Sequence, residues 1–167
     1  DQGSRFDAEG NLENWWTEED RARFEERTKR LIEQYDALTP RDLEGEEPPL
    51  HVNGALTLGE NIGDLAGLSI AWQAYVSRLK EKGETAQTAP AIDGLTAAQR
   101  FFTSWARGWR TAIRREFAKQ LLSIDPHSPA EFRCNQVVAN MDSFAEAYDL
   151  APDDALWIAP NERVRIW

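Results

Sequence analysis

The most informative stretch of this chain is Thr57-Leu58-Gly59-Glu60-Asn61-Ile62-Gly63-Asp64. It opens a helical pattern that we expect to run to about Lys82 and end at Gly83, because glycine commonly closes helices. Glu60 and Asp64 are four residues apart, so a helix places both carboxylates on one face. That face continues through small residues, Gly67, Ala71 and Ala74, and the opposite face is bulky, with Leu58, Ile62, Leu65, Trp72, Val76 and Leu79. We therefore expect a helix that is buried on two sides, with acids that face protein partners.

Two interpretations of these acids remain open at this point. Thr57 and Glu60 fit a capping box, in which the glutamate side chain accepts from the threonine backbone N–H. Asp64 fits a solvated acid that the helix dipole favours near a helix start. Buried acids would instead require a cation, a hydrogen-bond donor or a metal. The spacing does not decide between these interpretations.

Composition limits the classes of partner. The chain has 167 residues, of which 41% are hydrophobic, enough for one globular domain with a real core. Its net charge of −10 argues against nucleic acid and anionic membrane surfaces as partners. The single cysteine, Cys134, excludes an internal disulfide. No apolar run approaches the roughly 20 residues that a membrane-spanning helix needs.

Further segments carry local signals for secondary structure. Thr17 is a good N-cap for an amphipathic helix that ends before Pro40. Residues 51–56 alternate weakly and predict a short strand before the central helix. We interpret His51, within that segment, as structural, because its spacing does not resemble a zinc-binding histidine pair.

A second capping box, Thr96-x-x-Gln99, opens an aromatic-rich helical pattern that continues to Leu121. The aromatic residues indicate a core-facing stripe more than a ligand platform. Four arginines form a basic face along this pattern, at positions 107, 110, 114 and 115. On an acidic chain we expect that face to pair with the protein's own acids.

A second informative stretch is Asp125-Pro126-His127-Ser128-Pro129-Ala130-Glu131-Phe132-Arg133. The run Ser-Pro-x-Glu at 128–131 fits the N-cap, N1 and N3 positions of a short helix. His127 then lies just outside the helix start, two residues after Asp125. A neighbouring acid can hold one tautomer or keep the ring protonated, as an oxyanion stabiliser requires. A histidine in an exposed turn fits the pattern equally.

These stretches together resemble the neprilysin-like zinc metallopeptidases. The family pattern V-N-G-x-L-T-L-G-E-N-I-A-D matches residues 52–64, with Gly63 where alanine is usual. The pattern D-x-H-S-P-x-x-F-R matches residues 125–133. The opening D-x-G-x-x-F-D resembles the segment that follows the H-E-x-x-H zinc helix in this family, and the tail is also similar. The resemblance covers nearly the whole chain.

The resemblance implies a mainly α fold, with residues 1–167 as the C-terminal helical portion of a thermolysin-like (zincin) metallopeptidase domain. Glu60 is implied as the third ligand of one zinc ion, and Asp64 as the partner of a zinc-binding histidine. His127, flanked by Asp125, is implied to bond the developing oxyanion. Arg133 is implied to bind the peptide substrate, a task that suits a planar guanidinium.

No H-E-x-x-H occurs in the 167 residues. We therefore expect the N-terminal portion of the same enzyme to supply two histidine ligands and the general base. The implied activity is hydrolysis of short peptides on the amino side of apolar residues, in a secreted or extracytoplasmic location. Two other hypotheses stay open: a non-catalytic helical module that binds peptides or a partner chain, and an unrelated cysteine hydrolase that uses Cys134 with His127.

Overall fold

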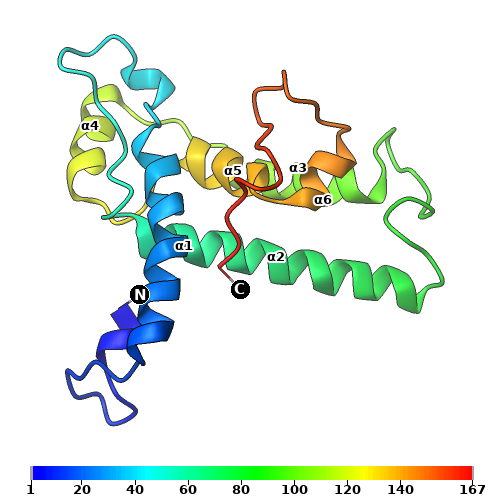
Figure 1. Cartoon of the computed structure of the whole chain (residues 1–167). Coiled ribbons are helices and arrows are strands. Elements are labelled where there is room, and N and C mark those ends of the chain that lie inside the picture. The colour runs from blue at the N-terminus through cyan, green and yellow to red at the C-terminus, as the bar shows by residue number, and fades with distance from the viewer. Residues whose placement is uncertain (1, 167) are drawn as a thin grey trace. The chain divides into compact units, whose positions relative to one another are not determined.

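The computed structural model describes residues 2–166 and is mainly helical, as predicted (Figure 1). The elements are η1 (Gln2–Arg5), α1 (Glu18–Asp36), η2 (Arg41–Leu43), α2 (Leu58–Glu81), α3 (Ala97–Gly108), α4 (Arg115–Ile124), α5 (Ala130–Ala139) and α6 (Asp142–Ala147). Isolated bridges are the only β pairing in the described part. No described helix combines the length and apolarity that crossing a membrane requires.

The chain divides into two compact units. Unit 1 comprises Asp1–Ile62, Arg114–Ser128 and Val164–Trp167, and unit 2 comprises Gly63–Ile113 and Pro129–Arg163. The boundary falls inside α2, so the first turn of this helix belongs to unit 1 and the rest to unit 2.

In unit 1, helix α1 begins where its cap predicts, since the Thr17 hydroxyl accepts the Asp20 N–H at 3.1 Å. The chain then returns against α1 at Gly54, whose N–H donates to an Asp36 carboxylate oxygen at 2.7 Å. A Cβ at Gly54 would collide with the Ile32 carbonyl oxygen, so this approach requires glycine. The approach fixes where α2 starts relative to α1.

The predicted strand over residues 51–56 is wrong. The Asn53 side chain accepts the Leu56 N–H at 2.9 Å, and the Asn53 carbonyl accepts the Thr57 N–H at 3.0 Å. These bonds make a tight turn, which removes the backbone groups that a strand would pair. His51 contacts the Thr39 hydroxyl at 3.1 Å, in keeping with a structural role.

Helix α2 ends at Glu81, and Gly83 has φ +74°, so the predicted glycine stop is confirmed. Within this chain only one of the two sides expected to be buried is covered. Its bulky face is buried, with Leu58, Ile62, Leu65, Leu68 and Leu79, whereas Gly63, Gly67, Ile70, Ala71 and Ala74 are exposed. Ile70 alone leaves 65% of its surface in solvent. The small-residue face of α2 therefore carries no packing partner among residues 2–166.

Unit 2 is built around an aromatic core. Leu65 and Leu68 of α2 pack with Phe102 of α3 and with Val137 and Val138 of α5. Rings extend this cluster across three helices, because Trp72 stacks on Phe102 and Phe102 meets Phe144 edge to face. The predicted aromatic stripe is a core at Phe102, and Trp105 packs against that core. Further along the stripe the expectation is wrong, because Phe117 leaves 51% of its surface in solvent.

The predicted continuous helix from Thr96 to Leu121 is interrupted. Its capping box forms, but α3 ends at Gly108, where the Trp109 N–H bonds back to the Ala106 carbonyl. Helix α4 begins at Arg115, and the break coincides with the change from unit 2 to unit 1. The two halves of the pattern belong to different packing units.

Candidate active site

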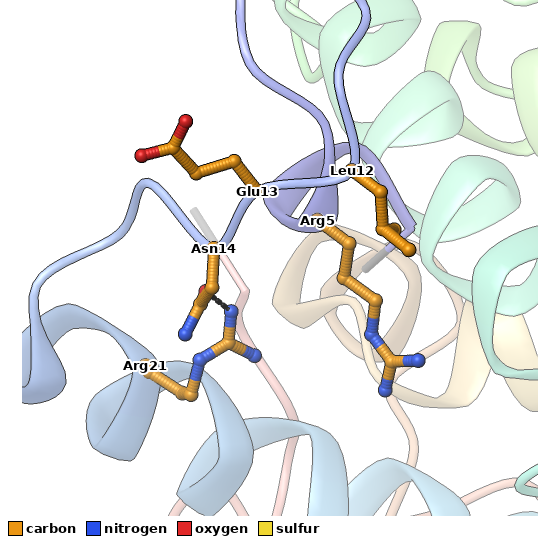
Figure 2. Close-up of a pocket in the computed structure, with 5 residues that line it drawn as sticks. All are labelled: Arg5, Leu12, Glu13, Asn14 and Arg21. Atoms are coloured by element: carbon orange, nitrogen blue, oxygen red, sulfur yellow. Dashed lines mark hydrogen bonds between the residues drawn. The ribbon is translucent and has the colours of Figure 1, made fainter.

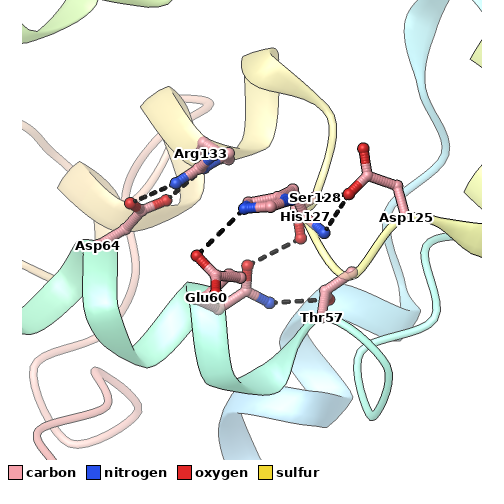
Figure 3. A network of polar contacts seen from close by, with 8 residues as sticks. Thr57, Glu60, Asp64, Asp125, His127, Ser128 and Arg133 are labelled. Atoms are coloured by element: carbon pink, nitrogen blue, oxygen red, sulfur yellow. Dashed lines mark hydrogen bonds and ion pairs between the residues drawn. The ribbon is translucent and has the colours of Figure 1, made fainter. Parts of the chain in front are cut away.

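Glu60 and His127 form the first pair of the candidate site, within unit 1. His127 Nε2 lies 3.3 Å from Glu60 Oε2 (Figure 3). The capping-box interpretation of Glu60 is wrong, because the Thr57 N–H donates to the Asn53 carbonyl instead. Both side chains are about half exposed, 47% for Glu60 and 44% for His127. The Glu60 carboxylate therefore has one protein partner and an open side.

Asp125 lies behind His127. Its Oδ1 contacts His127 Nδ1 at 2.7 Å and also accepts the His127 backbone N–H at 2.9 Å. A carboxylate only accepts, so Nδ1 carries a proton in this contact, and Nε2 is directed at Glu60. The flanking acid noted in the sequence therefore does orient the ring.

Asp64 and Arg133 form the second pair, within unit 2. Arg133 Nε and Nη2 donate to the two Asp64 oxygens at 2.7 and 2.8 Å, a bidentate contact (Figure 3). The guanidinium also lies over the Trp109 ring, 4.3 Å from its centroid. From the sequence, Asp64 and Arg133 were expected to have separate partners, and their pairing was not predicted. The only signal was their opposite charge, which many other residues share.

Sequence reasoning also missed a buried polar network in unit 1. The Ser128 hydroxyl donates to Asn61 Oδ1 at 2.8 Å, and Asn61 Nδ2 donates to the Thr57 hydroxyl at 3.0 Å. Ser128 was predicted to cap α5, and this is wrong: Pro129 occupies the N-cap position, and no side chain caps it. The Ser128 hydroxyl is directed to Asn61 instead.

The donor set fits part of a zinc site. Among residues 2–166, no three His, Cys, Asp or Glu side chains are grouped so that they could hold a metal ion. Glu60 offers one half-exposed carboxylate, and carboxylate oxygen is an ordinary zinc ligand. A complete site needs at least two more ligands. The residues present therefore fit one ligand of a zinc ion and not the whole set.

Cys134 does not match an activated nucleophile. Burial raises the pKa of the Cys134 thiol above its ordinary value, and a reactive cysteine needs the opposite shift. This disfavours the cysteine-hydrolase hypothesis.

A surface pocket of about 350 Å³ lies apart from these residues in unit 1, lined by Arg5, Leu12, Glu13, Asn14 and Arg21 (Figure 2). The Arg21 guanidinium donates to the Asn14 side chain, and the Glu13 carboxylate points away from both arginines. None of the predicted site residues lines it.

Comparison with known proteins gives one consistent family. The model of peptidase family M13 matches residues 1–164. Neprilysin-1 of Caenorhabditis elegans is 38% identical over 167 residues, all of this chain and 21% of that protein. The neutral endopeptidase of Lactococcus lactis is 36% identical over 165 residues, 99% of this chain and 23% of that protein. The chain thus spans about a fifth of the length of the curated relatives it matches.

The fold of this chain is also similar to that of a solved zinc metalloprotease. The crystal structure of Mycobacterium tuberculosis zinc metalloprotease Zmp1 with an inhibitor matches all of this chain and 25% of its own, with a TM-score of 0.90 and 56% identity. The resemblance to neprilysin-like enzymes, first noted in two short motifs, is confirmed over the whole length. This chain belongs to peptidase family M13.

Proposed function

We propose that this chain is the C-terminal part of the catalytic domain of a zinc-dependent metalloendopeptidase that hydrolyses short peptides. In this proposal Glu60 is the third zinc ligand, and another segment of the enzyme supplies two histidines and a general base. We call the assembly of this chain with that segment the complete peptidase. The same family resemblance favours a location outside the cytoplasm.

The observation that carries the proposal is the contact between His127 and Glu60, with Asp125 behind it. A ligand carboxylate and an oriented imidazole lie next to each other, as a site for carbonyl hydrolysis requires. When bound, zinc would polarise the scissile carbonyl and lower the pKa of a bound water towards ~7. His127 would donate from Nε2 to the oxygen on which negative charge develops, and Asp125 would keep the ring aimed.

Asp64 and Arg133 would act on the binding side of the site. The bidentate bond to Asp64 and the contact with Trp109 hold the guanidinium in one orientation. A pre-oriented guanidinium binds a substrate carbonyl or carboxylate with little further loss of side-chain entropy. Asp64 would also accept a bond from a zinc-binding histidine of the complete peptidase, because each carboxylate oxygen has two lone pairs.

The alternative is a non-catalytic helical module that binds a peptide or a partner chain. It is favoured by the incomplete donor set among the described residues. Both functions would retain the Arg133 contacts, and they differ in whether Glu60 holds a metal.

The test uses the complete peptidase, a short peptide substrate and two variants. Glu60→Ala should abolish both cleavage and stoichiometric zinc, because one of three protein ligands is lost. Glu81→Ala, an exposed acid at the far end of α2 that pairs with Arg78, is the matched control and should retain both. Retention of tight zinc by Glu60→Ala would overturn the ligand assignment. If the complete peptidase cleaves no peptide, the binding-module function replaces this one.

The isolated 167-residue chain gives a second, simpler measurement. Calorimetric titration with zinc should reveal no tight stoichiometric site, because Glu60 is a single ligand. A tight site that survives His51→Ala and His127→Ala would mean that other residues hold the metal.

A further inference from the structure

We propose that Asn61 is a positioning residue, which sets the distance between His127 and Glu60 through a buried chain of hydrogen bonds. The inference rests on the proposed function of Glu60 and His127 and adds a residue that does not touch metal or substrate. All the residues in this chain of bonds belong to unit 1.

The network is continuous and shielded from water. Asn61 is 1% exposed, and its two hydrogen-bonding neighbours, Thr57 and Ser128, are buried as well. Ser128 Oγ donates to Asn61 Oδ1, Asn61 Nδ2 donates to Thr57 Oγ1, and Thr57 Oγ1 donates to the Asn53 carbonyl at 3.0 Å. Figure 3 shows the Thr57 and Ser128 ends of this path. Each polar atom has lost water, so it must keep its protein partner.

The network joins the two neighbours of the functional pair. Asn61 follows Glu60 in the first turn of α2, and Ser128 follows His127 in the loop before α5. The Ser128–Asn61 bond spans 67 positions of sequence. It therefore ties the loop that carries His127 to the helical turn that carries Glu60.

The Ser128–Asn61 hydrogen bond restrains the position of His127 more than the His127–Glu60 contact does. The His127–Glu60 contact is long, at 3.3 Å, and about half exposed, so solvent screens it. The buried bond is shorter and unscreened, and motion of the loop would leave an amide and a hydroxyl without partners. Asn61 is thus suited to keep His127 in place when zinc or substrate takes over the Glu60 carboxylate.

The inference is tested in the complete peptidase with Asn61→Leu, which is similar in size and makes no hydrogen bonds, and with Ser128→Ala. Both should lower kcat, by about tenfold to a hundredfold, because displacements near 1 Å cost this much in catalysis. KM should stay within about twofold and zinc should remain stoichiometric. The double variant should be no slower than the slower single one, because both remove the same bond.

Asn140→Leu is the matched control. Asn140 is 4% exposed, and its side-chain amide donates to the Gln136 carbonyl at 2.9 Å, in unit 2. It should lower Tm and leave kcat unchanged.

If Asn61→Leu and Ser128→Ala also lower only Tm, or if kcat falls because zinc is lost, the positioning role is wrong. Ser128→Ala deletes one hydroxyl and keeps the test informative if Asn61→Leu does not fold. If Glu60→Ala is inactive while Asn61→Leu and Ser128→Ala are fully active, only the positioning role of Asn61 is wrong. If Glu60→Ala is active, the proposed function is wrong.

Discussion

Helix α2 carries two acid–base pairs of opposite character in its first two turns. Glu60 meets His127 through a single 3.3 Å contact between side chains that are about half exposed. Asp64 meets Arg133 through two bonds below 3 Å, with 11% of the aspartate and 19% of the arginine side chain exposed. A single contact between exposed side chains contributes little to stability, so either side chain can readily take another partner. A nearly buried, bidentate pair is costly to break.

This difference matches a division of labour in the proposed function. In that proposal Glu60 binds the metal, and its carboxylate has an open side. It loses little interaction energy when it exchanges His127 for another partner. The carboxylate that must hold an arginine is committed to it by geometry and burial. The predictions that follow test whether the two pairs differ as much in effect as they do in structure.

The largest expected effect is on the rate of the complete peptidase. His127→Ala should lower kcat by about a hundred- to a thousandfold, the usual cost of removing one oxyanion donor. Zinc content and KM should change little, because the donor acts chiefly in the transition state. Steady-state kinetics and metal analysis measure both. His51→Ala is the control, since the His51 ring contacts the Thr39 hydroxyl and lies outside the candidate site. A raised KM with an unchanged kcat would contradict the oxyanion role.

The second prediction concerns the buried pair. Arg133→Ala should lower the free energy of unfolding by about 2–3 kcal/mol, somewhat less than for a fully buried pair, because Asp64 loses its partner. It should also raise KM more than it lowers kcat, because in the proposed function Arg133 binds the substrate equally in the ground state and in the transition state. Urea unfolding of the 167-residue chain and kinetics of the complete peptidase give the two values.

Two further variants test the contrast between the exposed pair and the buried pair. Arg133→Lys keeps the charge and loses the bidentate hydrogen bonding, so it should retain only part of the stability that Arg133→Ala loses. Glu60→Gln removes the charge of the exposed pair and should change the free energy of unfolding by less than about 0.5 kcal/mol. Equal losses for Glu60→Gln and Arg133→Ala would show that burial does not separate the two pairs.

The smallest effect is expected at a third ion pair, intermediate in exposure. Glu46 contacts Arg115 and Lys119 of α4, which confirms that part of the predicted basic face pairs with the protein's own acids. Hydrogen bonds from Lys119 and Arg115 hold the pKa of Glu46 below its ordinary value of 4.5. A lowered pKa in the folded state means that the contribution to stability is full above pH 4.5. It is lost as the pH falls through the folded-state value.

The measurement compares the Tm of the unsubstituted chain with that of Glu46→Gln as a function of pH. The unsubstituted chain should be more stable at pH 7, and the difference should shrink below pH 4.5 as Glu46 takes up a proton. Arg115→Gln removes a partner from the other side of the contact and should weaken the same pH dependence. A Tm difference that is constant from pH 7 to pH 3 would mean that these contacts do not stabilise the folded state through the Glu46 charge.

Several features that depend on neighbours within four residues were predicted correctly. Thr17 and Thr96 cap their helices, and Gly83 ends α2, because each acts on backbone groups one turn away. The continuous helix predicted across Trp109 was wrong at a point where the partner, Arg133, is distant in sequence. The strand predicted at 51–56 was wrong for a local reason, because the Asn53 side chain accepts the Leu56 N–H and the Asn53 carbonyl accepts the Thr57 N–H, which makes a tight turn.

The family, the mainly helical class and the residue types that the proposed chemistry needs could all be predicted from the sequence. The long-range pairs could not, since Arg133 lies 69 positions from Asp64 and Ser128 lies 67 positions from Asn61. Ser128 illustrates the reason. Its local sequence fits a helix cap. In the folded chain the Ser128 hydroxyl is buried beside Asn61 and donates to the Asn61 side chain, so it does not cap the helix. Which of these competing hydrogen bonds forms depends on the three-dimensional packing, because every group that packs around a polar atom adds to its desolvation.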